Sequence, residues 1–189
     1  MRPSSERSGY RNPPGRQEPF SDPALRCLTS GNPRPAPIVS HVPNQPPEPL
    51  TPAQATRILH ENFAPWILAL NLTVEQTTPT QTTLRLPWSP TLTREGGTLC
   101  GQALLAAADT ATVLAISAAR GAYCPMTTVQ QNTTFQRPIH ETDVLLTAHV
   151  TKLGRTLAFT DITMTPTPPP GTPPPPPAAH ATTVYALLG

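Results

Sequence analysis

Apolar residues recur with helical spacing near the start of the foldable part of this chain and with strand spacing directly after it. Thr51 and Pro52 suit an N-cap and a first turn, and the apolar residues that follow are spaced by about 3.6 up to Pro65. Apolar and polar residues then alternate over residues 66–75 and again over residues 84–88. The pattern predicts one helix and two antiparallel strands, each strand with one buried face.

Residues 98–120 break this alternation. From Gly101 to Ala119 the only charged residue is Asp109, and most other positions are Ala, Leu, Val or Ile. This length and alanine content favour a helix that is apolar almost all round and therefore buried. Gly121 is suited to the residue that ends the helix, where a left-handed backbone is common.

Four strand-like segments follow this helix. The first covers residues 126–136, and its residues Val129, Thr133 and Phe135 are expected to share one face. A tight connection at Gly154-Arg155 joins the next two segments. The remaining segments are residues 144–150, 158–164 and 182–188. One apolar helix beside about six antiparallel strands predicts an α+β fold whose sheet wraps around the helix.

Proline sets the expected domain boundaries. The chain has 28 prolines, concentrated in residues 3–52 and 166–177, where the fixed φ and the missing N–H exclude regular helix and central strand. Residues 1–50 contain few large apolar groups, so we expect a disordered arm, with a polyproline arm that docks a partner as the alternative. We expect one domain over residues 51–189, with residues 166–177 as a proline-rich loop.

Charge and cysteine usage exclude several classes of protein. The net charge of +2 arises in the first fifty residues, because residues 51–189 hold seven basic and seven acidic side chains; we therefore expect no nucleic-acid partner. Three cysteines without a Cys-x-x-Cys pair argue against a disulfide framework and a zinc site, so no metal is expected. The chain has neither an uncharged apolar run of about 20 residues nor a secretory signal, so we expect no membrane span and a cytoplasmic location.

Asp109 is the strongest candidate for chemistry. Burying an unpaired carboxylate among alanines costs several kcal/mol, so Asp109 either takes part in a reaction or is held by a structural hydrogen bond or ion pair. The helix start is the second candidate, because the N–H groups near Gly101 carry a partial positive charge that suits a carbonyl oxygen gaining negative charge. Eight residues, about 12 Å along a helix, separate Gly101 from Asp109. Pairing of two subunits would bring one helix start beside the other chain's Asp109.

Residues 97–111, Gly-Thr-Leu-Cys-Gly-Gln-Ala-Leu-Leu-Ala-Ala-Ala-Asp-Thr-Ala, resemble the central-helix motif of hotdog acyl-CoA thioesterases of the phenylacetate-pathway type. Residues 132–138, Asn-Thr-Thr-Phe-Gln-Arg-Pro, resemble the strand of that family that ends in Phe-x-Arg-Pro, and residues 152–155 resemble its next hairpin. The resemblance covers about residues 51–188. It implies a hotdog fold, in which an antiparallel sheet of five to six strands wraps around one long central helix, and assembly as a homodimer or homotetramer.

The resemblance also implies an activity and a set of site residues. The reaction would be hydrolysis of an acyl or aroyl thioester, with coenzyme A as part of the substrate and no other cofactor. Asp109 would act as general base or nucleophile, and the N–H of Gly101 would polarise the thioester carbonyl across a subunit interface. The residues expected to bind substrate are Cys100, Gln102, Thr112, Asn132, Arg137 and Arg155. The alternative for Arg137 and Arg155 is a solvated surface charge, and the alternative for Thr112 and Asn132 is an ordinary helix or strand position.

The chain departs from the family pattern at two positions. Cys100 stands where the family has His, and Gln102 stands where it has a second Gly. These departures favour an alternative, a non-catalytic module of the same fold that binds acyl thioesters. The thiol of Cys100 at a helix start also opens a covalent route, although no His is adjacent in sequence to act as its base. A hydratase is disfavoured, because Leu114 stands where those proteins have the His that follows their Asp by five residues.

Overall fold

The computed structural model describes residues 50–188. The expected arm at residues 1–50 lies outside the described residues except for Leu50, which is buried in the core at 6% exposure. The structure has three α-helices, two short 3-10 helices and six strands within the described part. The elements are α1 (Pro52–Asn62), α2 (Pro65–Leu68), β1 (Thr73–Thr77), β2 (Gln81–Leu86), η1 (Pro90–Leu92), η2 (Glu95–Gly97), α3 (Gly101–Arg120), β3 (Met126–Phe135), β4 (Val144–Leu153), β5 (Leu157–Pro166) and β6 (Ala179–Leu187).

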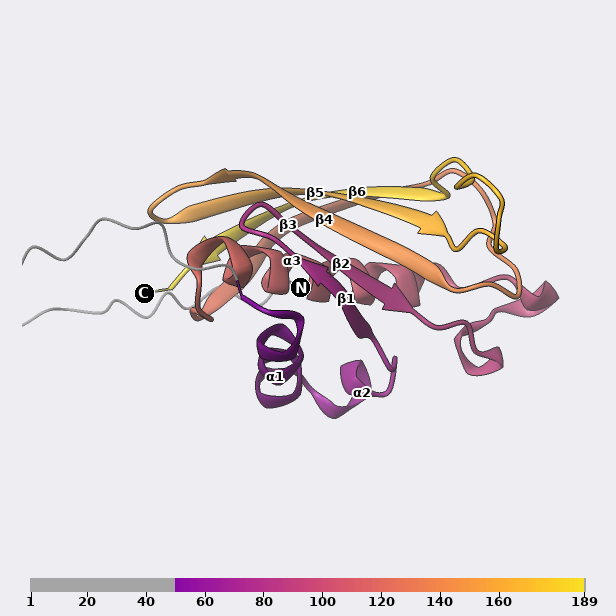
Figure 1. Ribbon diagram of the computed structural model, residues 1–189, viewed down its shortest axis with the longest axis horizontal. Coiled ribbons are helices and arrows are strands. Elements are labelled where there is room, and N and C mark those ends of the chain that lie inside the picture. The colour runs from indigo at the N-terminus through magenta and orange to yellow at the C-terminus, as the bar shows by residue number, and fades with distance from the viewer. Residues whose placement is uncertain (1–49, 189) are drawn as a thin grey trace, which may run out of the picture. The chain divides into compact units, whose positions relative to one another are not determined.

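All six strands form one antiparallel sheet in the order β1-β2-β4-β5-β6-β3. Figure 1 shows the long helix α3 lying along one face of this sheet, with α1 beside β1. The long helix and the six strands confirm the α+β fold class that the sequence predicts. Because β3 is last in the strand order, one of its sides has no strand neighbour in the described chain.

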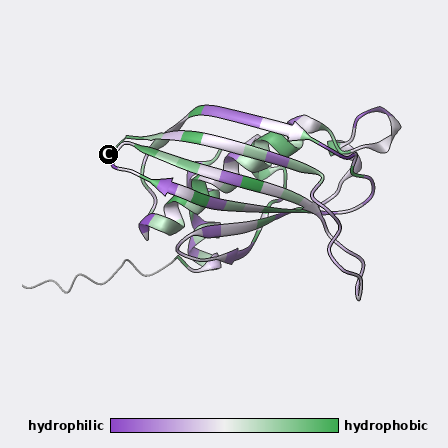
Figure 2. Ribbon diagram, turned by 90° about the horizontal axis from the view of Figure 1, so that it is seen from above, coloured by the Kyte–Doolittle hydropathy of each residue, from purple (hydrophilic) through white to green (hydrophobic). Residues whose placement is uncertain are grey.

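The core lies between α3 and the inner face of the sheet. Strand residues alternate between the two faces, so hydrophobic and hydrophilic positions interleave along the strands in Figure 2. Alanines at Ala107 and Ala111 are fully buried and let the helix approach the sheet closely, while Leu114 fills the space against inward residues such as Leu84 and Leu146. Gly121 ends the helix in the left-handed conformation, at φ 74°, as predicted.

The predicted first strand is wrong over residues 66–72. These residues form the short helix α2 and a connecting segment, and β1 begins only at Thr73. Pro65 occupies the first turn of α2, a position for which its fixed φ is already suited. The period-two pattern misleads here because Leu70 and Leu72 are buried without belonging to a strand, whereas Trp66 is 63% exposed.

A β-bulge alters the predicted face of β3. Thr133 and Phe135 pair with the inward residues Ala181 and Ala179 of β6, so they share the face that looks toward α3. The register shifts between Thr128 and Gln130, which makes Val129 an extra residue in the ladder. Val129 therefore has no directly opposed partner in β6, and its side chain is 60% exposed.

The other boundaries differ by a few residues. The last strand begins at Ala179 rather than at residue 182, so the proline-rich loop joins β5 and β6 over residues 167–178. Helix α3 is long and apolar enough to cross a membrane by length and composition, but 72% of its most apolar stretch is buried inside the fold.

Candidate functional site

Asp109 lies in the middle of α3, half-buried, on the side of the helix that meets β3 and β6. Its Oδ1 atom accepts a hydrogen bond of 3.0 Å from the hydroxyl of Thr128 on β3 and another from the hydroxyl of Tyr185 on β6. Among the described residues no donor contacts Oδ2 within hydrogen-bond distance. One carboxylate oxygen is thus held by the sheet and the other is available to a ligand or water.

Asp109 lines a pocket of about 210 Å³. The walls of this pocket come from the end of α1, from α3, from the segment before β3, and from β3 and β6. Its lining residues are Asn62, Phe63, Asp109, Val113, Tyr123, Met126, Thr127, Thr128 and Tyr185. Hydroxyl, amide and carboxylate groups contribute to the lining, so the pocket can hold water beside the carboxylate.

The β-bulge places the two hydroxyl groups that contact Asp109. Thr128 lies directly opposite Tyr185 in the β3–β6 ladder, and the register shifts immediately after Thr128. Side chains of directly opposed residues emerge on the same face of a sheet. Tyr185 is an inward position of β6, at 1% exposure, so Thr128 also faces α3 at the turn that carries Asp109.

The phenol of Tyr185 is held in its neutral form. Burial raises its pKa most, and the charge of Asp109 and the hydrogen bond to it act in the same direction. A neutral phenol has a proton to donate, whereas a phenolate would repel the Asp109 carboxylate. Tyr185 is thus a hydrogen-bond donor to Asp109 throughout the neutral pH range.

The N-terminus of α3 forms a second pocket, of about 470 Å³. Cys100 is the N-cap but makes no side-chain cap, and no hydrogen bond involves the N–H of Gly101 among the described residues. The lining residues are Arg94, Thr98, Leu99, Gly101, Leu104, Phe135, Gln136, Arg137, Pro138 and Ile139. The residues that line this pocket therefore include two arginines and the glycine with the free helix N–H, and none of them is acidic.

Two of the predicted site residues line this second pocket, and two lie next to it. Gly101 and Arg137 line it, and the guanidinium of Arg137 donates a hydrogen bond of 2.7 Å to the carbonyl oxygen of Pro177 in the proline-rich loop. Cys100 is half-buried and packs partly against the core, and Gln102 is exposed on the first turn of α3.

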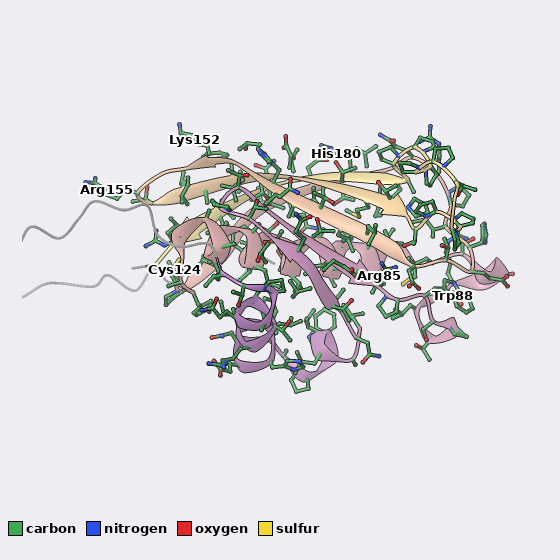
Figure 3. All side chains as sticks on the ribbon, in the orientation of Figure 1. Arg85, Trp88, Cys124, Lys152, Arg155 and His180 are labelled. Atoms are coloured by element: carbon green, nitrogen blue, oxygen red, sulfur yellow. The ribbon has the colours of Figure 1, made fainter. Side chains whose placement is uncertain are left out.

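Thr112, Asn132 and Arg155 lie away from both pockets. Thr112 is fully buried, and its hydroxyl lies 3.2 Å from those of Thr160 and Thr183, so it contacts the sheet instead of a pocket. Asn132 pairs with the exposed Thr182 and therefore faces away from α3. Figure 3 shows Arg155 at the end of the molecule that carries Cys124, beyond the C-terminus of α3, whereas the second pocket lies at its N-terminus.

Sequence reasoning singled out Asp109 and Gly101 but missed Thr128 and Tyr185. Part of this could have been predicted, because Ala181, Thr183 and Tyr185 occupy alternate, buried positions of the last strand. A buried phenol needs a hydrogen-bond partner. Nothing in the sequence indicates that this partner is Asp109, which lies 76 residues earlier. Within residues 50–188, no group of three or more His, Cys, Asp or Glu side chains is placed to hold a metal ion.

Part of the chain is similar to a known protein family. Residues 96–169 match the model of the thioesterase superfamily, a segment that includes all of α3 and strands β3, β4 and β5. No curated protein matches the chain.

Several solved structures share the fold. A putative thioesterase from Silicibacter sp. TM1040 is 27% identical, over 77% of this chain and 97% of its own, with a TM-score of 0.64. Zebrafish thioesterase superfamily member 2 is 26% identical, over 73% of this chain and 99% of its own, with a TM-score of 0.61. The E. coli PaaI protein from the phenylacetic acid degradation operon is 17% identical, over 74% of this chain and 97% of its own, with a TM-score of 0.61. The described part of this chain therefore has the hotdog fold of these structures, and its residues 96–169 are similar to the thioesterase superfamily.

Proposed function

We propose that this protein is a thioesterase that hydrolyses an acyl- or aroyl-CoA, with Asp109 as general base or nucleophile. The observation that carries the proposal is the asymmetric bonding of the Asp109 carboxylate. Oδ1 accepts both hydrogen bonds, Oδ2 accepts none from the described residues, and Asp109 lines a polar pocket. The match of residues 96–169 to the thioesterase superfamily supports the reaction class.

The reaction follows from the carboxylate and one water molecule. As a general base, Asp109 takes a proton from water while the water oxygen bonds to the thioester carbonyl carbon. The C–S bond then breaks, and the proton passes to the departing CoA sulfur, which leaves a carboxylic acid and a free thiol. As a nucleophile, Oδ2 would instead bond to the carbonyl carbon, and the C–S bond would break to release the CoA thiolate, which takes up a proton. Water would then hydrolyse the resulting anhydride to the carboxylic acid product and the free Asp109 carboxylate.

The N–H of Gly101 is the proposed donor to the carbonyl oxygen. It belongs to the first residue of α3, has no hydrogen-bond partner in the described chain and lines the larger pocket. A preorganised backbone donor stabilises the negative charge that develops on a thioester carbonyl, and loss of one such donor typically costs about 100- to 1000-fold in rate. The guanidinium groups of Arg94 and Arg137 line the same pocket and suit the phosphates of CoA.

We further propose that the two groups act together across a dimer. The Thr128 end of β3 lies beside Asp109, whereas its Phe135 end lies against Gly101. If two copies pair their free β3 edges antiparallel about a two-fold axis, the Phe135 end of one strand lies near the Thr128 end of the other. That arrangement joins the Gly101 pocket of one subunit to the Asp109 pocket of its partner.

A non-catalytic module that binds acyl thioesters is the second candidate. It is favoured by Cys100, which makes no side-chain hydrogen bond at the helix start and stands where the resembled family has His. A thiol is a weak donor and polarises a carbonyl less than an imidazole. This candidate predicts that CoA thioesters raise the melting temperature without release of free thiol.

A free-thiol assay against a panel of acyl- and aroyl-CoAs separates the two candidates. We expect the wild-type protein to release CoA and Asp109→Asn to release none above background, because the amide neither accepts a proton nor attacks. Asp161→Asn is the matched control, since Asp161 is an exposed carboxylate on the outer face of β5. Thioester binding without turnover in the wild-type protein would support the binding module and contradict the enzyme.

One single-turnover measurement in oxygen-18 water distinguishes the two roles of Asp109. General-base catalysis places the label only in the carboxylic acid product. In nucleophilic catalysis, water attack on the Asp109 carbonyl of the anhydride places it in the Asp109 side chain, so label in Asp109 establishes the nucleophilic role. Mass spectrometry of the peptide that contains Asp109 detects oxygen-18 in its side chain.

A further inference from the structure

Tyr185 is the largest side chain that is fully buried in the described part of the chain. Its ring packs in a small cluster with Val113, Ile116 and Cys124, under the C-terminal half of α3. Its hydroxyl donates to Oδ1 of the Asp109 carboxylate and lies 3.3 Å from the main-chain oxygen of the same residue. The side chain thus has an apolar part that packs and one polar atom whose contact is with the proposed catalytic group.

We propose that Tyr185 is a positioning residue, which together with Thr128 fixes the Asp109 carboxylate so that Oδ2 alone is presented to the substrate. The inference rests on the proposed thioesterase function and deepens it. It assigns to Tyr185 a role in the rate of the chemical step through Asp109, without contact to the substrate.

Two donors on one oxygen restrict the rotation of a carboxylate more than a single donor does. Both hydroxyl groups come from neighbouring strands, Thr128 from β3 and Tyr185 from β6, and the two residues are directly opposed in the ladder. Their positions are set by the sheet, so they hold Oδ1 from a rigid surface. Oδ2 is the carboxylate oxygen without a donor among the described residues, and Asp109 lines the pocket of about 210 Å³.

The phenol is suited to this role because it stays protonated. Burial and the adjacent Asp109 charge raise the pKa of Tyr185, so the hydroxyl donates at every pH at which the enzyme would work. Hydrogen bonds to a charged group are also stronger than neutral ones. A serine or threonine at the same position would be too short to reach Asp109 from β6 and would leave part of the cluster unfilled.

A purely structural role for Tyr185 predicts different behaviour. If only its packing matters, then loss of the hydroxyl lowers stability and leaves the rate unchanged. The test therefore removes the hydroxyl and keeps the ring, in Tyr185→Phe. The matched control is Thr183→Val, which removes a buried hydroxyl from the same face of the same strand, where it bonds to Thr112 and Thr160 but not to Asp109.

Steady-state kinetics with the CoA thioester that the wild-type protein hydrolyses gives the first readout. We expect Tyr185→Phe to lower kcat by about tenfold or more with KM within about twofold, because a hydrogen bond to a charged group is lost while the substrate contacts remain. We expect Thr183→Val to keep the wild-type kcat even where its melting temperature falls. An unchanged kcat in Tyr185→Phe, with Asp109→Asn inactive, would overturn the inference and leave the proposed function intact.

Carbon-13 NMR of labelled aspartate side chains gives a readout that does not need turnover. The Asp109 carboxyl resonance is the one that disappears in Asp109→Asn. We expect this resonance to shift in Tyr185→Phe and to stay in place in Thr183→Val. An unshifted resonance in Tyr185→Phe would overturn the inference independently of any assay, whereas failure of wild-type hydrolysis would contradict the proposed function.

Discussion

The ring of Phe135 lies against Gly101, so that a Cβ added at Gly101 would stand 3.1 Å from the Cζ atom of the ring. This contact ties the end of β3 to the first residue of α3. It leaves a bare backbone N–H at the wall of the larger pocket, with an aromatic ring beside it. The position therefore favours glycine for its lack of a side chain, since its φ is not in the left-handed region.

Substitution of Gly101 by proline isolates the backbone donor. Proline is well tolerated at the first helical position, and the extended backbone of Cys100, with ψ 145°, suits the residue before a proline. We expect Gly101→Pro to lower kcat by about 100-fold or more, because the donor to the thioester oxygen is lost.

Gly101→Ala is the control for this substitution, because it adds the Cβ near Phe135 but keeps the N–H. We expect it to retain most of the activity, since Phe135 is 49% exposed and its ring has room to shift. Equal kinetic losses in the alanine and proline variants would show that crowding, not the lost donor, is responsible.

Substitution of Val129 by lysine tests the proposed dimer edge. Val129 is 60% exposed on the strand that has no neighbour on one side, and a lysine on an edge strand opposes pairing with another strand. We expect wild-type protein to have at least twice the chain mass of 20.2 kDa in light scattering, and Val129→Lys to be monomeric and inactive.

Leu157→Lys serves as the comparison, because Leu157 is 38% exposed at the start of β5, an interior strand of the sheet. We expect it to retain the wild-type mass and activity. A monomeric wild-type protein with full activity would contradict the shared site.

The raised pKa of Tyr185 predicts an effect of alkaline pH on stability. Since burial favours the neutral phenol in the folded state, the unfolded chain ionises first, near the usual tyrosine value of about 10. The contribution of this group to folding is fully present below that pH and is lost as the pH rises above it. We expect the melting temperature of wild-type protein to fall more steeply above about pH 10 than that of Tyr185→Phe. Parallel curves from circular dichroism would contradict the assignment.

The sequence predicts those parts of the fold in which one pattern runs over many residues. Helix α3 carries a charge only at Asp109 over its buried length, and Gly121 ends it, so both its extent and its burial could be predicted. Strands β4 and β5 flank Gly154 and alternate over most of their length, apart from a register shift between Val150 and Lys152, so they could be predicted as a hairpin. The prediction of a strand directly after Pro65 was wrong, because a short run of alternating leucines fits a buried connection as well as a strand.

The candidate site could be predicted only in part. Asp109 is noticeable in sequence because it is a carboxylate within an apolar helix. Its donors Thr128 and Tyr185 are ordinary strand residues, and they reach it only because β3 and β6 pair in a register that includes a bulge. Pairing between strands that are distant in sequence is set by tertiary packing, and the local spacing of apolar residues does not predict it.

A mixture of two inactive variants tests the central claim, hydrolysis at a site that two subunits share. Gly101→Pro lacks the proposed donor and Asp109→Asn lacks the proposed base, so each homodimer has no complete site. After unfolding and refolding together, a mixed dimer contains one site with both groups intact. We predict that the equimolar mixture recovers about a quarter of the wild-type rate of thiol release, because half of the dimers are mixed and half of their sites are complete. A mixture as inactive as its two components, despite subunit exchange shown by mass spectrometry, would contradict the shared thioesterase site.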